Sequence, residues 1–279
     1  MFLFLQQLFY LKLKGKENFK TNLIQYNQMQ ILGIDIGGTG IKAAIVNTVT
    51  GELLTERHRV PTPKPAKPKA VAKVIKEIID KFNWQGPVGC CFPTTIVNGQ
   101  CMHYSNMDKG WLNVKVDKLF KEECNGLDFY VSNDADLAGF AEVSLGAGKG
   151  IKGKVIVITV GTGIGSGLFY DGNLIPNVEL GHIFHPNGDI IEKFTADSVR
   201  RKEDLSLKKW AKRLDFFFNH VKVIHSPELF ILGGGISKKF DKYKEHFTVD
   251  VPIEVAKFGN NAGIIGAAIY AEKKSKKKH

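Results

Sequence analysis

The first part of the chain is patterned as short apolar runs separated by turns. Residues 31–35 and 41–46 are two apolar runs joined by a glycine turn at 37–40, which predicts a β-hairpin. Residues 53–60 are predicted to continue as a third strand. The prolines within 61–68 then form a stiff connector, because proline lacks the N–H that a sheet interior requires. The chain therefore opens with a strand–turn–strand unit and leaves its sheet through a proline-rich segment.

The remainder of the chain alternates between predicted helices and strands. Apolar residues at 71, 74, 75, 78, 79 and 82 recur at helical spacing, so this segment is predicted to be an amphipathic helix. Strands are predicted at 88–92, 127–131, 155–160, 166–170 and 229–232, and further helices at 135–145, 203–225 and 262–271. The strands at 155–160 and 166–170 flank a glycine turn and repeat the opening pattern. A hairpin followed by strands and helices therefore occurs twice, which predicts a duplicated α/β architecture.

Positive charge is concentrated at the two ends of the chain. The 279 residues contain 39 Lys and Arg against 28 Asp and Glu, a formal charge of +11. Five lysines between 273 and 278 and a net +3 within residues 1–28 account for eight of these charges. The body of the chain is only mildly basic. We therefore expect no nucleic-acid partner and interpret residues 273–279 as a solvated basic tail.

Residues 1–28 precede the first strongly periodic segment, which begins at Gln30. The apolar stretch 1–13 lacks a basic leader and a small-residue cleavage site, and it is too short to span a membrane. We expect residues 1–28 to be an extension outside the fold, with a cleaved or anchoring leader as the alternative. No membrane partner is expected.

The four cysteines show no metal-binding or redox spacing. Cys90 and Cys91 are adjacent in a predicted strand, so they point to opposite faces and are expected to pack as small core residues. A disulfide framework is not expected in so long a chain with so few cysteines. The composition suits the reducing cytoplasm.

Glycine clusters follow three of the predicted strands, at 37–40, 161–165 and 233–235. Glycine lets backbone N–H groups approach an anion without a Cβ in the way, so three such turns indicate phosphate binding. The chain has neither a G-x-x-x-x-G-K-[ST] motif nor the protein-kinase motifs. The G-x-G-x-G at 161–165 differs from a dinucleotide fingerprint, because a strand rather than a helix follows it.

Five short motifs stand in the order that is typical of the sugar-kinase/Hsp70/actin superfamily, at 33–39, 133–135, 161–165, 233–235 and 263–267. Glu179-Leu180-Gly181-His182 is similar to the sugar-binding signature of the ROK (repressor, ORF, kinase) family. The chain thus resembles the ROK sugar kinases over about residues 30–272.

This resemblance implies an α/β fold of the two-lobed actin-like ATPase (ribonuclease H-like) type, in which the duplicated hairpin and α/β units surround a central cleft. The first lobe would comprise residues 29–131 and 262–272, and the second residues 132–261.

Within the family, the chain is similar to the branch that uses polyphosphate at segments 86–89, 106–111, 176–182 and 236–238. Most ROK proteins carry a cysteine-rich zinc loop after the signature histidine, whereas residues 183–192 contain no cysteine. His182 and His185 alone cannot complete a tetrahedral zinc site, so zinc is not expected.

The resemblance gives the central chemical role to Asp134. A sugar hydroxyl is a poor nucleophile, and a carboxylate within hydrogen-bonding distance can accept its proton as it attacks phosphorus. Asp134 follows a predicted strand, the position at which ligands bind in α/β proteins. The alternative is that Asp134 serves only as the N-cap of the helix at 135–145.

The other site residues are also implied by the resemblance. The sugar-binding set comprises Asn106, Asp108, Asn133, Glu179 and His182. The set that binds the phosphate donor comprises Asp35, Gly37, Gly38, Thr39, Gly40, Lys42, Gly161, Thr162, Gly163, Gly165, Gly233, Gly234 and Gly235. Asp35 is expected to position Mg²⁺, directly or through water. For Asn106, Asp108 and His182, a purely structural role is the alternative.

The implied reaction transfers a phosphoryl group from polyphosphate, or from ATP, to the 6-hydroxyl of glucose. The superfamily accommodates adenosine at the turn that corresponds to residues 233–235, so ATP stays open as a donor. Two basic groups, at 149–154 and 200–213, are each either a solvated face or a polyphosphate groove.

The sequence leaves three alternative functions to compare with this one. An ATP-dependent ROK kinase for another hexose or an amino sugar is the closest alternative. A sugar-responsive regulator would need an N-terminal helix-turn-helix, for which residues 1–28 are too short and wrongly patterned. An actin-like or chaperone-like ATPase would not need the signature at 179–182. ROK kinases are commonly homodimers, so a cytoplasmic homodimer is expected.

Overall fold

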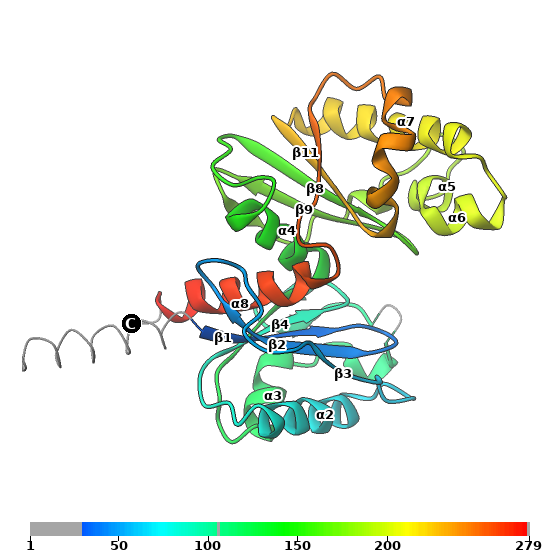
Figure 1. Ribbon diagram of the computed structural model, residues 1–279. Helices are drawn as coiled ribbons and strands as arrows, with labels where there is room; N and C mark the ends of the chain where they lie inside the picture. Colours follow the sequence, from blue (N-terminus) through cyan, green and yellow to red (C-terminus); the bar gives the residue numbers. More distant parts are fainter. Residues whose placement is uncertain (1–29, 105–106, 278–279) are drawn as a thin grey trace, which may run out of the picture.

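The computed structural model describes residues 30–104 and 107–277, which form two lobes built on two five-stranded sheets (Figure 1). The strands of the first sheet, in the order β3-β2-β1-β4-β7, are His58–Val60, Ile41–Asn47, Gln30–Ile36, Val88–Phe92 and Phe129–Asn133. The strands of the second sheet, in the order β10-β9-β8-β11-β12, are Asn173–Ile175, Ile164–Tyr170, Lys154–Val160, Leu229–Gly233 and Ile253–Val255.

The two sheets have the same topology. In each, three antiparallel strands that follow one another in the chain are continued by two parallel strands. Parallel neighbours require crossover connections, which the helices supply. This duplicated hairpin and α/β unit confirms the predicted two-lobed actin-like fold.

Helices cover the outer face of each sheet and fill the space between the lobes (Figure 1). Apolar faces of α2 (Pro68–Lys81) and α3 (Val116–Glu123) pack in the core of the first lobe. The long helix α7 (Leu207–His225) packs in the core of the second, near the short helices α5 (Glu192–Thr195) and α6 (Asp197–Lys202).

The remaining two helices, α4 (Asp134–Leu145) and α8 (Ala262–Ser275), lie between the sheets and pack against each other. Helix α8 contacts the first sheet, and α4 contacts β8 and β9 of the second. The contact is close, because a Cβ at Gly266 would lie only 1.7 Å from the carbonyl oxygen of Leu137. A small-residue helix therefore joins the lobes.

Short elements complete the chain. A hairpin of β5 (Ile96–Val97) and β6 (Gln100–Cys101) lies between β4 and β7 in the sequence. The 3₁₀ helices are η1 (Lys109–Trp111), η2 (Leu180–His182), η3 (Gly235–Lys242), η4 (Lys244–His246) and η5 (Gly259–Asn261).

The predicted strand at 53–60 is wrong over most of its length. Only His58–Val60 pairs continuously with β2, and Leu53 makes an isolated bridge to Val46. The N–H of Ile45 donates to the side-chain hydroxyl of Thr55 at 3.1 Å instead of to a strand carbonyl. This side-chain acceptor replaces the backbone ladder at that point.

Other element boundaries also differ from the predictions, among them β7, which was predicted at 127–131 and spans Phe129–Asn133. Helix α7 begins at Leu207 rather than 203, because Ser206 caps it by accepting from the N–H of Lys209 at 3.3 Å. Strand β9 begins within the glycine cluster, at Ile164. Helix α8 continues to Ser275, where lysines in the last turn favour the helix C-terminus.

The cysteines behave as predicted. All four are free and buried, with Cys90 and Cys91 packed in different core clusters. Within the described parts of the chain, no helix is both long and apolar enough to cross a membrane. The division into lobes at 131/132 and 261/262 stays a proposal, and the extension 1–28 lies outside the described residues.

Candidate active site

Asp134 lies at the junction between the first sheet and the helix that packs on the second. It is the first residue of α4 and directly follows β7. The N-cap of this helix is Asn133, whose Oδ1 accepts from the N–H groups of Ala135 at 2.8 Å and Asp136 at 3.1 Å. The helix is therefore already capped by its neighbour. Asp134 itself accepts, through Oδ1, a hydrogen bond from the N–H of Ala135 at 2.8 Å.

Carboxylates from both lobes converge on Asp134. Burial raises the pKa of Asp134 to about 6, and the charges of Asp35 and, more weakly, Glu179 act in the same direction. The hydrogen bond from Ala135 opposes them. Asp35 comes from β1 and Glu179 from the segment that precedes η2. A carboxylate with a pKa near neutrality can both hold and release a proton at working pH, as a general base must.

The first glycine turn joins β1 to β2 beside these carboxylates. Asp35 and Lys42 are register partners in the hairpin, and the Lys42 ammonium lies 3.0 Å from Oδ2 of Asp35. Thr62 fastens the turn by donating to the carbonyl of Gly37 at 2.5 Å. Arg59 donates to the carbonyl of Thr39 at 3.1 Å. The residues at 35–42 that were predicted to bind the phosphate donor thus meet at one strand end. Arg59 adds a cation beside them that no sequence motif indicated.

The other two glycine turns lie side by side, because they follow the neighbouring parallel strands β8 and β11. The turn at 161–163 is closed by a hydrogen bond from the N–H of Gly161 to the carbonyl of Gly163 at 3.0 Å. Gly234 has φ +83°, and a Cβ there would lie 2.2 Å from the carbonyl oxygen of Val160. Only glycine fits this position. Gly165, by contrast, lies inside β9 rather than in the turn.

Two residues that the sequence analysis missed hold the turn at 161–163. Ser198, in α6, donates its N–H to the carbonyl of Gly161 at 3.1 Å and its hydroxyl to that of Thr162 at 2.6 Å. Glu192, the first residue of α5, accepts from the N–H of Ile164 at 3.1 Å. Neither contact has a local sequence signal, since each joins segments far apart in the chain.

The predicted sugar-binding residues that the structure describes come from three places. Glu179 and His182 lie just before and at the end of η2, and the N–H of His182 donates to the carbonyl of Glu179 at 3.0 Å. Asn133 ends β7, and Asp108 caps η1 by accepting from the N–H of Gly110 at 2.8 Å. Asn106 lies outside the described residues. Asp108 therefore has the turn role that was its structural alternative.

Asp136 and Asn177 form a further part of this region. Asp136 is fully buried on α4, and its Oδ2 accepts from the N–H of Asn177 at 2.9 Å. Burial raises the pKa of Asp136 to about 7, with smaller contributions from Glu179 and Asp134. Asn177 lies in the segment 176–182 that resembles the polyphosphate branch of the family. Its side chain, however, bonds to Ile96 in the distant strand β5, and no pattern in the sequence indicates this contact.

Few protein side chains are available as ligands for Mg²⁺. Among the described residues, no three His, Cys, Asp or Glu side chains gather into a group that could hold a metal ion. Mg²⁺, however, is commonly held by one or two carboxylates together with substrate phosphates and water. Asp35 fits this pattern, because its ion pair with Lys42 occupies Oδ2 only. The convergent negative charge around Asp134 is what a divalent cation would offset.

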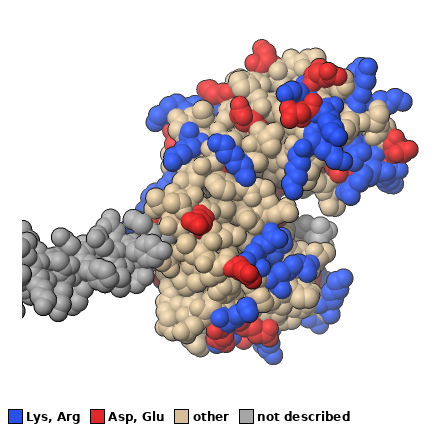
Figure 2. All heavy atoms as spheres, viewed as in Figure 1, with Lys and Arg blue, Asp and Glu red and all other residues tan. Residues whose placement is uncertain are grey.

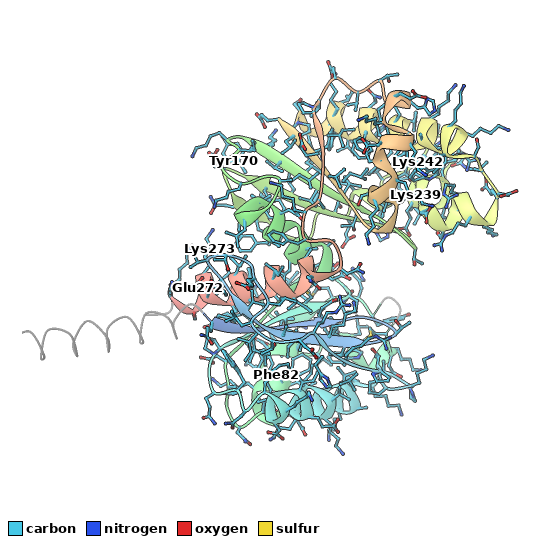
Figure 3. The ribbon with its side chains drawn as sticks, in the orientation of Figure 1. Phe82, Tyr170, Lys239, Lys242, Glu272 and Lys273 are labelled. Carbon is cyan, nitrogen blue, oxygen red and sulfur yellow. The ribbon has the colours of Figure 1, made fainter. Side chains whose placement is uncertain are left out.

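Lysines extend from the third glycine turn along η3. Lys238, Lys239 and Lys242 are exposed, and within the described chain none of them forms an ion pair. Figure 2 shows that Lys and Arg side chains gather on this side of the second lobe, and Figure 3 shows Lys239 and Lys242 on η3. The lysines at 149–154, by contrast, precede or begin β8, at the opposite end of the strand from Gly161.

This fold and site define a two-lobed sugar-kinase-like protein, and comparison with known proteins identifies its family. The ROK family model matches residues 31–193. The chain belongs to the ROK family.

Individual relatives narrow the comparison. The chain is 42% identical to a polyphosphate glucokinase of Mycobacterium tuberculosis over 237 residues, which cover 85% of this chain and 89% of that protein. It is 25% identical to a glucokinase of Halalkalibacterium halodurans, over 84% of this chain and 92% of that protein.

A solved structure is similar to this chain to the same degree. The inorganic polyphosphate/ATP-glucomannokinase of Arthrobacter sp. strain KM shares 44% identity, with a TM-score of 0.80 over 88% of this chain and 99% of that one. The similarity to a ROK family glucokinase of Streptomyces griseus, at 22% identity and a TM-score of 0.74, shows the shared fold.

Proposed function

We propose that this protein transfers a terminal phosphoryl group from inorganic polyphosphate, or from ATP, to the 6-hydroxyl of glucose, giving glucose 6-phosphate. The observation that carries the proposal is the buried Asp134 carboxyl, with its pKa raised to about 6, between a sugar-signature residue and a glycine turn. The names of the relatives that are 42% and 44% identical, a polyphosphate glucokinase and a polyphosphate/ATP-glucomannokinase, support this donor and acceptor.

In the proposed reaction, Asp134 accepts the proton of the sugar hydroxyl as the oxygen attacks phosphorus. Its ionised form dominates above about pH 6, so it is ready at neutral pH. The hydrogen bond from Ala135 leaves the other carboxylate oxygen, Oδ2, for the hydroxyl.

The proposed sugar site draws on both lobes. Glu179 and His182 come from the second lobe, and Asp108 comes from the first, as does Asn133, which ends β7 of the first sheet. The proposed set also includes Asn106. The amide nitrogen of Asn133 can donate to a sugar hydroxyl, because the helix cap uses only Oδ1. Polar groups that would stay unpaired with the wrong sugar discriminate strongly between acceptors.

The proposed donor site consists of the three glycine turns. In this proposal Thr39, Lys42 and the N–H groups of 38–40 bind the transferred phosphoryl group, since the N–H of Gly37 already donates to the carbonyl of Gly40. Thr162 and the turns at 161–163 and 233–235 hold the phosphates behind it. Mg²⁺ bound through Asp35 would supply charge neutralisation and alignment of the phosphates. Phosphoryl transfer depends mainly on such positioning, so these groups are sufficient.

The remainder of a polyphosphate chain would leave the site along η3. Lys238, Lys239 and Lys242 continue directly from the turn at 233–235 and form no ion pair within the described residues. Lys154 begins β8, about 20 Å from Gly161 at the strand's other end, so the 149–154 group is a solvated face in this proposal.

The decisive experiment measures glucose 6-phosphate formation by the purified chain with Mg²⁺ and either long-chain polyphosphate or ATP. Activity with polyphosphate is expected. Activity with ATP alone would reduce the proposal to an ATP-dependent ROK glucokinase, which the similarity to the Halalkalibacterium halodurans glucokinase also fits. Mannose is the second acceptor to test, since the Arthrobacter protein is named a glucomannokinase. Inactivity with both donors and both sugars would refute the proposal.

The proposal also covers the cellular compartment, the oligomeric state and the partners of the enzyme. We place it in the cytoplasm, because four free thiols suit a reducing compartment. We propose a homodimer whose partners are glucose and the phosphate donor, with neither nucleic acid nor a membrane involved.

A further inference from the structure

The side chain of Asn177 connects the two lobes beside the sugar signature. Its Oδ1 accepts from the N–H of Ile96 at 3.2 Å, and its Nδ2 donates to the carbonyl of Ile96 at 3.0 Å. One amide thus satisfies both backbone groups of a residue 81 positions away. Ile96 belongs to β5 in the first lobe, whereas Asn177 follows β10 of the second.

The backbone of Asn177 is fixed as well. Its φ of +61° lies in the left-handed region, which asparagine tolerates better than most residues. In this conformation its N–H donates to Asp136 at 2.9 Å. Asn177 therefore joins β5, its own loop and helix α4, the helix that Asp134 begins.

The loop that Asn177 fixes carries Glu179. The hydroxyl of Ser166 holds the residues on both sides of Glu179, because it donates to the carbonyl of Val178 and accepts from the N–H of Leu180 at 2.9 Å. Glu179 is thus held between two attachments, one to the second sheet and one, through Asn177, to the first lobe.

Strand β5 leads into the other half of the sugar set. Its hairpin is closed by hydrogen bonds from the N–H of Met102 to the carbonyl of Thr95 at 3.0 Å and from the hydroxyl of Thr94 to the carbonyl of His103 at 2.8 Å. From there the chain continues to Asp108. The Asn177 side chain therefore fastens the segment that leads to Asp108 to the loop that carries Glu179.

We propose that Asn177 is a positioning residue for the sugar, which holds the Glu179 loop of one lobe in register with the β5 segment of the other. This inference rests on the proposed function, in which Glu179 binds the acceptor sugar. Asn177 itself does not contact the reacting atoms. Its loss should weaken the binding of the sugar and leave the donor site unchanged, because within the described residues no hydrogen bond joins it to the glycine turns.

The test replaces Asn177 by glycine and compares it with the same replacement at Asn98. Glycine keeps the left-handed backbone at both positions, since Asn98 has φ +50°. Asn98 lies in the turn of the same hairpin, and no hydrogen bond of its side chain occurs within the described residues. The pair therefore differs only in the side-chain contacts to Ile96.

For Asn177→Gly we expect the KM for glucose to rise about tenfold, the size expected when one or two hydrogen bonds that hold a binding group are lost. The KM for the donor should stay within about twofold of wild type, and Asn98→Gly should match wild type in both constants. Asn177→Asp keeps the acceptor for the Ile96 N–H but places a carboxylate oxygen against the Ile96 carbonyl oxygen, so it should raise the KM for glucose at least as much as Asn177→Gly. It also serves if the glycine variant does not fold.

Several outcomes would overturn the inference. An unchanged KM for glucose in both Asn177 variants would do so, as would a fall in thermal stability alone, or an equal rise of KM for both substrates. If the wild-type chain phosphorylates glucose and the variants match it, only the positioning role fails. If the wild-type chain does not phosphorylate glucose, the proposed function and this inference fail together.

Discussion

Lys42 and Asp35 face each other across the β1–β2 hairpin, and their 3.0 Å ion pair is partly buried, with 30% and 18% of the two side chains exposed. The same Asp35 carboxylate raises the pKa of Asp134. Because opposite charges at short range offset each other, Lys42 limits the negative charge to which Asp134 is exposed.

Replacing Lys42 by methionine should therefore move the pH dependence of the reaction. With Asp35 unpaired, proton loss from Asp134 becomes harder, and the acid limb of kcat/KM should shift to higher pH by up to about one unit. The measurement is the pH profile of kcat/KM for glucose from pH 5 to 9. Lys73→Met, on the exposed face of α2, is the matched control and should leave the profile unchanged. An unshifted limb in Lys42→Met would contradict this coupling.

Asp134→Asn removes the proposed base and keeps the shape of the side chain. Asparagine can still accept from the N–H of Ala135, so the start of α4 should stay intact. We expect kcat to fall about 10²–10⁴-fold, the range that general-base catalysis contributes. In the wild type, the acid limb of kcat/KM should lie near pH 6, because the base must be ionised and burial has raised its pKa to about 6. A variant that keeps more than about a tenth of the wild-type kcat would exclude Asp134 as the base.

The fold was predictable where each element carries its own signal. Strand β4 matches its predicted limits at both ends, 88 and 92, because Pro87 and Pro93 bound an apolar run. The duplication could be read from two strand–glycine–strand patterns. The third strand was not predictable, because the Thr55 hydroxyl takes the N–H of Ile45 through a contact that no local pattern records.

The same distinction applies to the residues of the candidate site. Asp134, Asp35 and the glycine turns stand at strand ends, so their order along the chain predicts that they meet. Asp136, Asn177, Glu192 and Ser198 act through contacts between segments 28 to 81 residues apart. Their residue types are common in loops and helix starts, and only the packed structure distinguishes them.

The lysines of η3 can be tested by removing their charge. The triple variant Lys238→Gln, Lys239→Gln and Lys242→Gln should raise the KM for long-chain polyphosphate about tenfold at low salt, because a row of cations concentrates a polyanion electrostatically. The KM for ATP, whose three phosphates would end at the glycine turns, should change less than about threefold.

The control for that experiment is the double variant Lys149→Gln and Lys152→Gln, which neutralises exposed lysines beyond the far end of β8. It should behave as wild type with both donors. A larger effect in the control than in the η3 variant would place the polyphosphate path on the other face of the second lobe. The difference between wild type and the η3 variant should also shrink as salt is raised, since salt screens exposed charges.

Asp136 should make the stability of the protein depend on pH in the direction opposite to that of a salt-bridged acid. Its folded pKa is raised to about 7, mainly by burial, while the unfolded value is close to 3.8. Its contribution to folding is therefore fully present below about pH 4 and is lost as the pH rises through about 7, when ionisation of the buried carboxyl opposes folding. Among the described side chains, Oδ1 of Asp136 is the buried polar atom that lacks a hydrogen bond.

Asp136→Asn removes this ionisation and keeps an acceptor for the N–H of Asn177. At pH 8 we expect the variant to be more stable than wild type, by on the order of 3 kcal/mol in the free energy of unfolding, and the difference should shrink to near zero at pH 4. Urea denaturation from pH 4 to 8 measures it. Asp204→Asn, at an exposed left-handed position, is the control and should give no pH-dependent difference. Asp134 titrates in both wild type and variant, so only its coupling to Asp136, the last-ranked cause of the Asp136 shift, differs between them. Curves for Asp136→Asn and wild type that stay parallel across this range would show that Asp136 ionises in the folded protein at its ordinary pKa, which would contradict the value raised by burial.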